Sequence, residues 1–85
     1  MKIEGEDIVF NSEEKWYLLE RAGRKPNTIR LVDWSEENEI ARCKPKFIRI
    51  HCEGEKTISF KRTISWMGRI DTVLGKSMLM FCWES

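Results

Sequence analysis

The feature that most constrains this fold is an alternation of apolar and polar residues in two neighbouring runs. In residues 47–52, Ile48, Ile50 and Cys52 occupy every second position, and Ile58 and Phe60 repeat the pattern in residues 57–61. Successive side chains of a strand point to opposite faces, so each run predicts a strand with one buried face. The short connection contains glycine, as a tight turn requires. The two runs therefore predict a β-hairpin.

The segment before the hairpin predicts a strand and the main helix. Residues 8–10 form a short apolar run typical of a strand. Asn11 and Glu14 stand in capping-box positions for a helix over about residues 12–22. Within that helix, Trp16, Leu19 and residue 22 or 23 follow a three-to-four spacing, which predicts one buried stripe.

The connection between residues 33 and 43 is acidic. Asp33 or Ser35 can cap a second short helix that ends near Cys43, with Ile40 as its one clear aliphatic anchor. An irregular loop is the alternative prediction for this stretch. Pro45 ends whichever structure precedes it.

The C-terminal third predicts further strands. Residues 62–66 continue the hairpin alternation through a bend or bulge, with Trp66 on the core face, whereas residues 67–71 are ambiguous. Gly75 marks a turn, and residues 78–83 form a continuous apolar run that predicts a strand buried on both faces. Trp83 ends this strand, so its indole N–H needs a partner or water.

These elements predict a single domain over residues 1–85, of the α+β class and mostly strand. The expected order is strand, helix, strand, acidic connection, hairpin and two more strands. The periodic apolar positions define the expected core: Trp16, Leu19, Ile29, Ile48, Ile50, Ile58, Phe60, Ile64, Leu79 and Phe81.

Composition limits the functional classes. No apolar run approaches the about 20 residues of a membrane span, and the acidic N-terminus is unlike a signal peptide. We therefore expect a cytoplasmic protein with no membrane partner. The three cysteines are scattered, and the one histidine has only Cys52 beside it, so we expect reduced thiols, no metal site and no cofactor.

The stretch most suggestive of function is residues 23–30. Gly23 can adopt the left-handed conformation that ends a helix, and Pro26 pushes Lys25 toward extended geometry. In the strand that follows, Thr28 and Arg30 point to the same side. These cationic and hydroxyl groups suit a phosphate, a carboxylate or a polar base edge.

The spacing Gly23-x-Lys25-x-x-Thr28-x-Arg30 resembles the G-x-K-x-x-[E/T]-x-R signature of the ASCH domains, a branch of the PUA-like β-barrels. The match is closest to small bacterial and phage-type members, and the element order extends it over most of the chain. The resemblance implies a small, mostly antiparallel β-barrel with a cleft beside the motif. One departure is Lys44-Pro45-Lys46, where family members often have Gly-Asp.

Some small members of that family hydrolyse acetylated cytidine with a lysine, a threonine and a later glutamate. The resemblance thus implies catalytic roles for Lys25 and Thr28. After the hairpin, however, the only carboxylates are Asp71 and Glu84, and the glutamate-bearing helix is shortened to about residues 67–75. This favours a binding module over an enzyme.

Charge is distributed unevenly. Residues 1–20 hold six carboxylates and two lysines, whereas residues 21–62 hold eleven cations and six anions. The basic middle adds Lys46 and Arg49 to the expected ligand-binding residues Gly23, Lys25, Thr28 and Arg30. Trp34 follows the motif strand and is the predicted base-stacking residue, with packing as a lid as its alternative.

Three functions remain open. The first is a module that binds RNA, a nucleotide or a modified nucleoside through the motif. The second is an amidohydrolase that acts on acetylated cytidine. The third is a phage-type accessory or inhibitor that binds a host protein, with the acidic residues 1–20 as its partner surface. An exposed apolar patch would favour the third.

Overall fold

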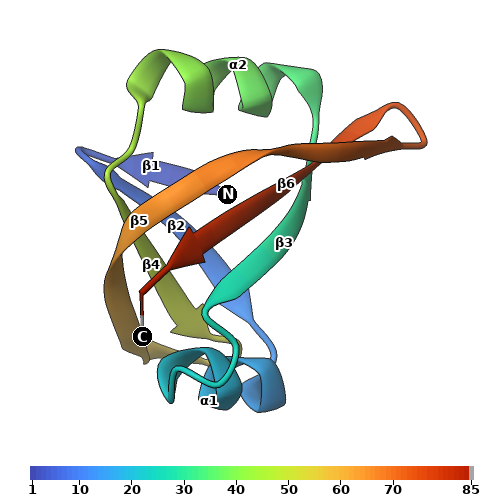
Figure 1. Ribbon diagram of the computed structural model, residues 1–85. Helices are drawn as coiled ribbons and strands as arrows, with labels where there is room; N and C mark the ends of the chain where they lie inside the picture. The colour runs from blue at the N-terminus through green and yellow to red at the C-terminus, as the bar shows by residue number, and fades with distance from the viewer. Residues whose placement is uncertain (85) are drawn as a thin grey trace.

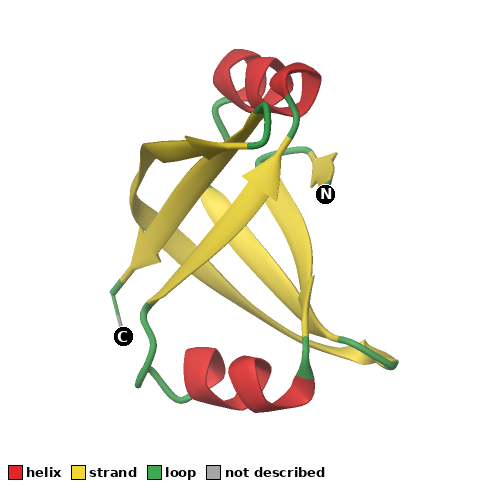
Figure 2. Cartoon of the chain, turned by 90° about the vertical axis from the view of Figure 1, so that its right-hand side faces the viewer, coloured by secondary structure: helices red, strands yellow, loops and turns green. Residues whose placement is uncertain are grey.

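Six strands form one curled sheet in the computed structural model, which describes residues 1–84 and, for residues 55–57, the backbone alone. The sheet order is β1-β2-β4-β5-β6-β3. The strands are β1 (Lys2–Glu4), β2 (Asp7–Ser12), β3 (Asn27–Val32), β4 (Phe47–Cys52), β5 (Glu55–Val73) and β6 (Lys76–Trp83). The two helices, α1 (Glu14–Arg21) and α2 (Trp34–Cys43), cover opposite ends of the curled sheet (Figures 1 and 2). The protein is therefore α+β and mostly strand, as predicted.

The predicted hairpin is confirmed as β4 and β5. Ile50 lies opposite Phe60, and Gly54 in the turn has a φ of 86°. The predicted bend is also present, because β5 is one long strand whose first part pairs with β4 and whose second part pairs with β6. Register shifts after Ile64 and Arg69 let it bend without ending. The ambiguous residues 67–71 are therefore strand.

One pair of neighbouring strands is parallel. β2 and β4 run in the same direction, with Ile8 opposite Ile48 and Phe10 opposite Ile50. The chain makes this parallel crossover through α1, β3 and α2. β1, which the sequence did not predict, adds an antiparallel edge beside β2.

The sheet does not close into a complete barrel. β1 and β3 are its two ends, and no backbone ladder joins β3 to β2 among residues 1–84. We call this gap between β2 and β3 the seam; it can be followed in Figure 2. Curling without closure leaves one edge of β3 without a neighbouring strand.

Helix α1 differs from its prediction in start and in phase. It begins at Glu14, and its N-cap Glu13 makes no side-chain capping bond, because Asn11 and Ser12 belong to β2. The buried side chains are Tyr17 and Glu20, one position on from the predicted stripe. Trp16 and Leu19 are 43% and 37% exposed, so their prediction as core residues was wrong. The buried stripe was predicted one position too early because the prediction used apolar residues alone, whereas the buried face of α1 includes Glu20, which has polar partners.

Helix α2 follows its prediction closely. Asp33 accepts from the backbone N–H of Glu36, and the Glu36 side chain accepts from the N–H of Asp33, which completes a capping box. Ile40 is the one buried residue of the helix. The alternative of an irregular loop is excluded, because this cap and this anchor together specify the helix.

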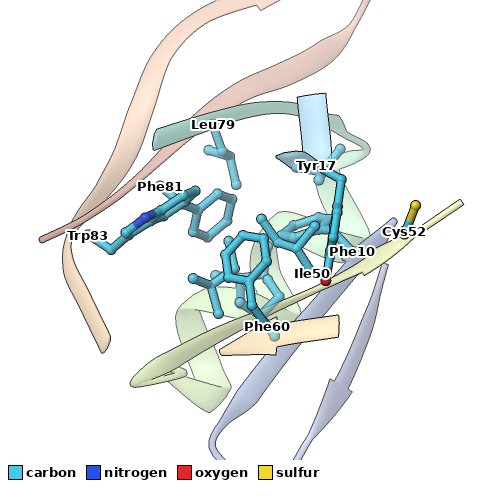
Figure 3. Packing of buried hydrophobic residues seen from close by; sticks show 12 residues of the cluster. Phe10, Tyr17, Ile50, Cys52, Phe60, Leu79, Phe81 and Trp83 are labelled. Carbon is cyan, nitrogen blue, oxygen red and sulfur yellow. The ribbon is translucent and has the colours of Figure 1, made fainter. Parts of the chain in front are cut away.

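The core lies inside the curled sheet and is sealed by α1 and α2 (Figure 3). Aromatic rings dominate it: Phe60 lies 5.4 Å from Tyr17 and 6.0 Å from Trp83, and Phe10 lies 5.2 Å from Phe81, between ring centroids. The buried apolar residues are Ile8, Phe10, Tyr17, Val32, Ile40, Ile48, Ile50, Cys52, Phe60, Leu79, Phe81 and Trp83. Ile64 packs against this cluster while only partly buried.

Three further core predictions were wrong. Ile29 and Ile58 are 47% and 42% exposed, and Trp66 is 50% exposed. In β3 the inward positions are Thr28, Arg30 and Val32, so Ile29 points outward. In β3 the polar residues Thr28 and Arg30 point inward because they line the seam. The apolar residues of a strand usually mark its buried face, and β3 is an exception.

Strand β6 is buried mainly on one face. Ser77, Leu79, Phe81 and Trp83 are buried, whereas the alternate residues are only partly covered. The prediction of burial on both faces was therefore half right. The Trp83 indole N–H is buried and finds no hydrogen-bond partner among the described residues.

Candidate functional site

The residues of the motif begin at the end of α1. The Gly23 N–H donates to the Glu20 carbonyl, and the Arg24 N–H donates to the Leu19 carbonyl, at 3.3 and 3.1 Å. This is a Schellman motif, and Gly23 occupies its left-handed position with a φ of 79°. The predicted helix-ending role of Gly23 is confirmed. The chain then turns sharply enough to bring Lys25 back over the helix.

Lys25 is held against the end of α1. Its Nζ donates to Glu20 Oε2 at 3.3 Å and to the Asn27 carbonyl at 2.9 Å. The carbonyl of Pro26 accepts from the Trp83 N–H, which attaches this turn to β6. Lys25 therefore acts as a hydrogen-bond donor in a defined position.

Thr28 and Arg30 point to the same inner side of β3, as predicted from their spacing. Arg30 Nε donates to Thr28 Oγ1 at 3.0 Å, while its two terminal nitrogens cross the seam to β2. Nη1 donates to the Asn11 carbonyl and Nη2 to Ser12 Oγ, both at 2.6 Å. Arg30 thus joins β3 to β2 where no backbone ladder does.

A buried carboxylate lies behind this arginine. Glu20 is 1% exposed, and its Oε1 accepts from Ser12 Oγ at 2.8 Å. The Ser12 hydroxyl therefore accepts from Arg30 and donates to Glu20, and Lys25 donates to the other oxygen of the Glu20 carboxylate. A buried charge is tolerated only when paired and hydrogen-bonded, and this network supplies both conditions.

Burial lowers the pKa of the Arg30 guanidinium below its ordinary value, and the Glu20 carboxylate partly opposes that shift. The group stays protonated at neutral pH because an arginine side chain is effectively always charged in proteins. Arg30 therefore presents a permanent positive charge in the seam.

Beside these residues lies a cleft of about 430 Å³, which we call the motif cleft. Its walls come from the end of β2, from α1 and from the turn into β3. The lining residues are Asn11, Ser12, Glu13, Trp16, Lys25, Asn27, Thr28, Ile29, Arg30 and Glu53. Lys25, Thr28 and Arg30 thus share one cleft, as their spacing predicted.

The motif cleft is polar without being strongly cationic. Lys25 and Arg30 face the carboxylates of Glu13 and Glu53 at its walls and of Glu20 behind them. Most donors of the two cations already have protein partners. Such a site lacks the excess positive charge with which proteins attract a nucleic-acid backbone.

A second cleft of about 450 Å³ lies farther along the seam. Asn11 and Arg30 line both clefts, and Val9, Phe10, Leu31, Val32 and Glu36 add mainly apolar walls to the second. The side chain of Arg30 therefore divides a longer depression between β2 and β3 into two parts.

The other predicted ligand residues do not line the motif cleft. The Trp34 indole N–H donates to the Gly75 carbonyl at 2.6 Å, so this ring packs against the β5–β6 turn. Lys46 pairs with Glu6 at 3.2 Å, and Arg49 pairs with Asp7 at 3.2 Å. Gly23 shapes the turn without lining the cleft. The basic middle of the sequence is thus divided among several surfaces.

Most carboxylates of the acidic N-terminal segment are either paired with cations of the same chain or buried. Glu4 pairs with Lys2, Glu6 with Lys46 and Asp7 with Arg49 and Lys61, while Glu20 is buried. These carboxylates therefore do not form one continuous acidic surface.

Sequence reasoning missed Trp16 and Ser12, which line the cleft, and Glu20, which is buried behind it. Trp16 lines it with a half-exposed ring, 5.9 Å from Lys25 Nζ, although its spacing indicated a core position. Ser12 and Glu20 were placed within the predicted helix over about residues 12–22, without a role in the site. The available signal was the spacing of four residues between Trp16 and Glu20, which places the two side chains on one side of a helix.

Neither helix has the length and hydropathy of a membrane-spanning segment. Among residues 1–54 and 58–84, no three histidine, cysteine or carboxylate side chains lie close enough together to hold a metal ion. The three cysteines are free thiols. Comparisons of the chain with protein-family models, with curated proteins and with solved structures find no match.

Proposed function

We propose that this chain binds a nucleoside or nucleotide, free or within an RNA, in the motif cleft. The observation that carries the proposal is that Lys25, Thr28 and Arg30 line one cleft together with the half-exposed ring of Trp16. The volume of about 430 Å³ falls within the range of roughly 300–1,000 Å³ typical of small-molecule sites. The proposal includes a PUA-like barrel that is open at the seam.

The chemistry of the lining supports a base and its sugar more than a chain of phosphates. Trp16 offers an aromatic face for stacking, and the amides of Asn11 and Asn27 offer donors and acceptors for a base edge. Lys25 and Arg30 can each donate further hydrogen bonds, which suits one phosphate or carbonyl group. The carboxylates at the walls oppose the close approach of a polyanion.

Binding can be tested by thermal shift and calorimetry with nucleosides, nucleotides and short RNAs. We expect one class of nucleoside or nucleotide to raise Tm and to give a saturable isotherm. Trp16→Ala should weaken binding by about 1–3 kcal/mol if the base stacks on the indole. Arg30→Lys should weaken it because lysine cannot reproduce the planar guanidinium contacts.

Arg42→Ala is the matched control, because Arg42 is exposed in the last turn of α2, away from the cleft. Salt dependence should be shallow, with a logarithmic slope of about −1 to −2. Absence of saturable binding across the screen would overturn the proposal. Equal affinity in wild type, Trp16→Ala and Arg30→Lys would show that the motif only shapes the turn.

An amidohydrolase remains the second candidate, because one observation favours it. The Glu20 carboxylate lies 3.3 Å from Lys25 Nζ, which supplies an acidic partner from α1 in place of one after the hairpin. Against this role, Lys25 donates to two acceptors, and Thr28 Oγ1 accepts from Arg30. Residues 67–75 also form strand and turn, where the family resemblance implied a helix.

Incubation with acetylated cytidine separates the two candidates. We expect no turnover above a buffer control, because a hydroxyl nucleophile without a free base loses most of its rate. Turnover that disappears in both Lys25→Ala and Thr28→Ala would replace the binding proposal with the enzymatic one.

A further inference from the structure

The outer face of β3, β6 and the second part of β5 is apolar. Residues directly opposite each other in a sheet project to the same side, so the register places Ile29, Met80 and Gly68 in one row. The neighbouring rows add Leu31 with Met78, and Cys82 with Trp66. We call these seven residues the apolar face; Asn27 and Asp71 bound it at either end.

This apolar face is substantially open to solvent. Ile29, Leu31 and Trp66 are 47%, 53% and 50% exposed. The Trp66 ring lies across Gly68, where an added Cβ would come within 2.8 Å of Trp66 Cζ2. The indole is therefore spread over the sheet surface. None of the seven residues has a charged side chain.

The corresponding outer face of the other half of the sheet is different. There Asp7, Arg49 and Lys61 form ion pairs of 3.2 and 3.0 Å across β2, β4 and β5. Covering those charges would cost desolvation, so that face suits water. The same chain thus has one outer sheet face suited to solvent and one suited to burial.

We propose that the apolar face is the interface of a weak homodimer, in which two copies pack sheet on sheet about a two-fold axis. A two-fold axis brings the same surface of each copy together, so a patch must be complementary to itself. The seven residues meet this condition because none of them is charged; the nearest charge in the same rows is Asp71, which lies opposite Met78 at the border of the face. The formal net charge of +1 adds little repulsion between copies.

The size of the apolar face sets the strength of the dimer. Its exposed area is on the order of 400 Å² per copy, within the roughly 300–600 Å² of the largest apolar patch on a typical monomer. A standard stable interface buries roughly 800 Å² per partner, about twice as much. We therefore expect reversible dimerisation in the micromolar to millimolar range. Ile29 belongs both to the apolar face and to the wall of the motif cleft, so the interface would border that cleft.

Sedimentation over a concentration series from low micromolar to millimolar tests the proposal. We expect wild type to shift from monomer to dimer. The double variant Ile29→Thr/Leu31→Thr should weaken association at least about tenfold, while threonine keeps the β preference of the strand. Leu18→Gln is the control, because Leu18 is 52% exposed on α1 and lies outside the apolar face. It should dimerise like wild type.

Concentration-dependent amide chemical shifts provide the second measurement, and circular dichroism melts verify that each variant is folded. Shifts confined to β3, β6 and the second part of β5 would support the proposal. A wild-type protein that stays monomeric, a double variant that dimerises equally well, or shifts confined to the charged face would overturn it. Binding to phosphatidylcholine vesicles in place of dimerisation would also overturn it, since the occupant would then be a lipid surface.

Discussion

Arg30 Nη2 donates to Ser12 Oγ at 2.6 Å, so a side chain joins β3 and β2 where the sheet has no ladder. The same guanidinium reaches the Asn11 carbonyl, and Ser12 in turn donates to Glu20. Two strands that are far apart in sheet order are thereby held at a defined separation. The motif residue expected to bind ligand also maintains the cleft in which a ligand would bind.

Arg30→Ala should destabilise the protein as well as weaken binding. It removes three hydrogen bonds from a charged donor, so we expect a loss of about 1–3 kcal/mol in the free energy of unfolding. Urea denaturation measures this change. Arg42→Ala, at an exposed position, should change the free energy by less than about 0.5 kcal/mol. Equal stability of Arg30→Ala and wild type would show that the hydrogen bonds of Arg30 across the seam do not stabilise the protein.

Glu20→Gln tests the buried end of the network. Glutamine keeps the shape but removes the charge that Lys25 and Arg30 face, and one of its terminal atoms becomes a donor. We expect a loss of about 1–3 kcal/mol by urea denaturation. Glu14→Gln, at an exposed position of the same helix, is the matched control. A neutral result for Glu20→Gln would mean that its charge contributes nothing to stability.

Phe60→Ala should be severe, because Phe60 is 7% exposed and packs between Tyr17 and Trp83. Removing a buried ring costs about 3–5 kcal/mol. Ile58→Ala, two residues earlier on the same strand and 42% exposed, should cost less than about 1 kcal/mol. Similar losses in the two variants would contradict the burial of Phe60 and the exposure of Ile58 seen here.

Tyr17→Phe should be neutral or stabilising by up to about 1 kcal/mol. The Tyr17 hydroxyl is buried and has no hydrogen-bond partner among the described residues, so its removal relieves a desolvation cost. The contrasting variant is Ser12→Ala, which removes a hydroxyl that has two partners and should destabilise. Thermal melts of both variants give the comparison. A loss above about 1 kcal/mol in Tyr17→Phe would reveal a partner, such as an ordered water.

Stability should fall in acid partly through Asp7. Lys61 lowers the pKa of Asp7 below its ordinary value most strongly, partial burial opposes the shift, and Arg49 adds to the lowering. A carboxyl whose folded pKa is lowered stabilises the protein above its unfolded pKa of about 3.9, and that contribution is lost as pH falls through the folded pKa.

Urea melts at neutral pH and at several acidic pH values test this dependence. Asp7→Asn should lose less stability between neutral pH and about pH 2 than wild type, because it lacks this titrating group. Glu4→Gln is the control, since Glu4 and its partner Lys2 are both more than half exposed. Identical acid dependence in wild type and Asp7→Asn would contradict the role of Asp7.

The sequence predicted local structure correctly where a backbone requirement is satisfied by residues close by in the chain. Asp33 or Ser35 was predicted to cap a second helix, and the structure has Asp33 as the cap, because a cap needs only neighbouring residues. Gly23 predicted the end of α1 because few other residues adopt a positive φ. The β4–β5 hairpin was predicted because its alternation is local and its turn is short.

The sequence predicted the wrong buried face for a helix and a strand in which polar residues point into the protein. Glu20 is buried because Ser12, eight residues earlier, donates to it, and no local pattern announces such a partner. The same holds for β3, where Thr28 and Arg30 face inward and Ile29 faces outward. In both elements an apolar residue marked the wrong side, because burial depends on which segment packs against it.

The sequence by itself determined the class of the protein, the hairpin, and the gathering of Lys25, Thr28 and Arg30 at one strand end, whereas it left residues 33–43 open between a helix and a loop. Tertiary structure decided that β2 and β4 run parallel, that the sheet stays open at the seam, and that Trp16 lines the cleft while Trp34 does not. The physical reason is how far apart in the sequence the interacting residues lie. Caps, turns and alternation are satisfied within a few residues, whereas pairing of distant strands and of a buried carboxylate depends on partners that only the complete fold brings together.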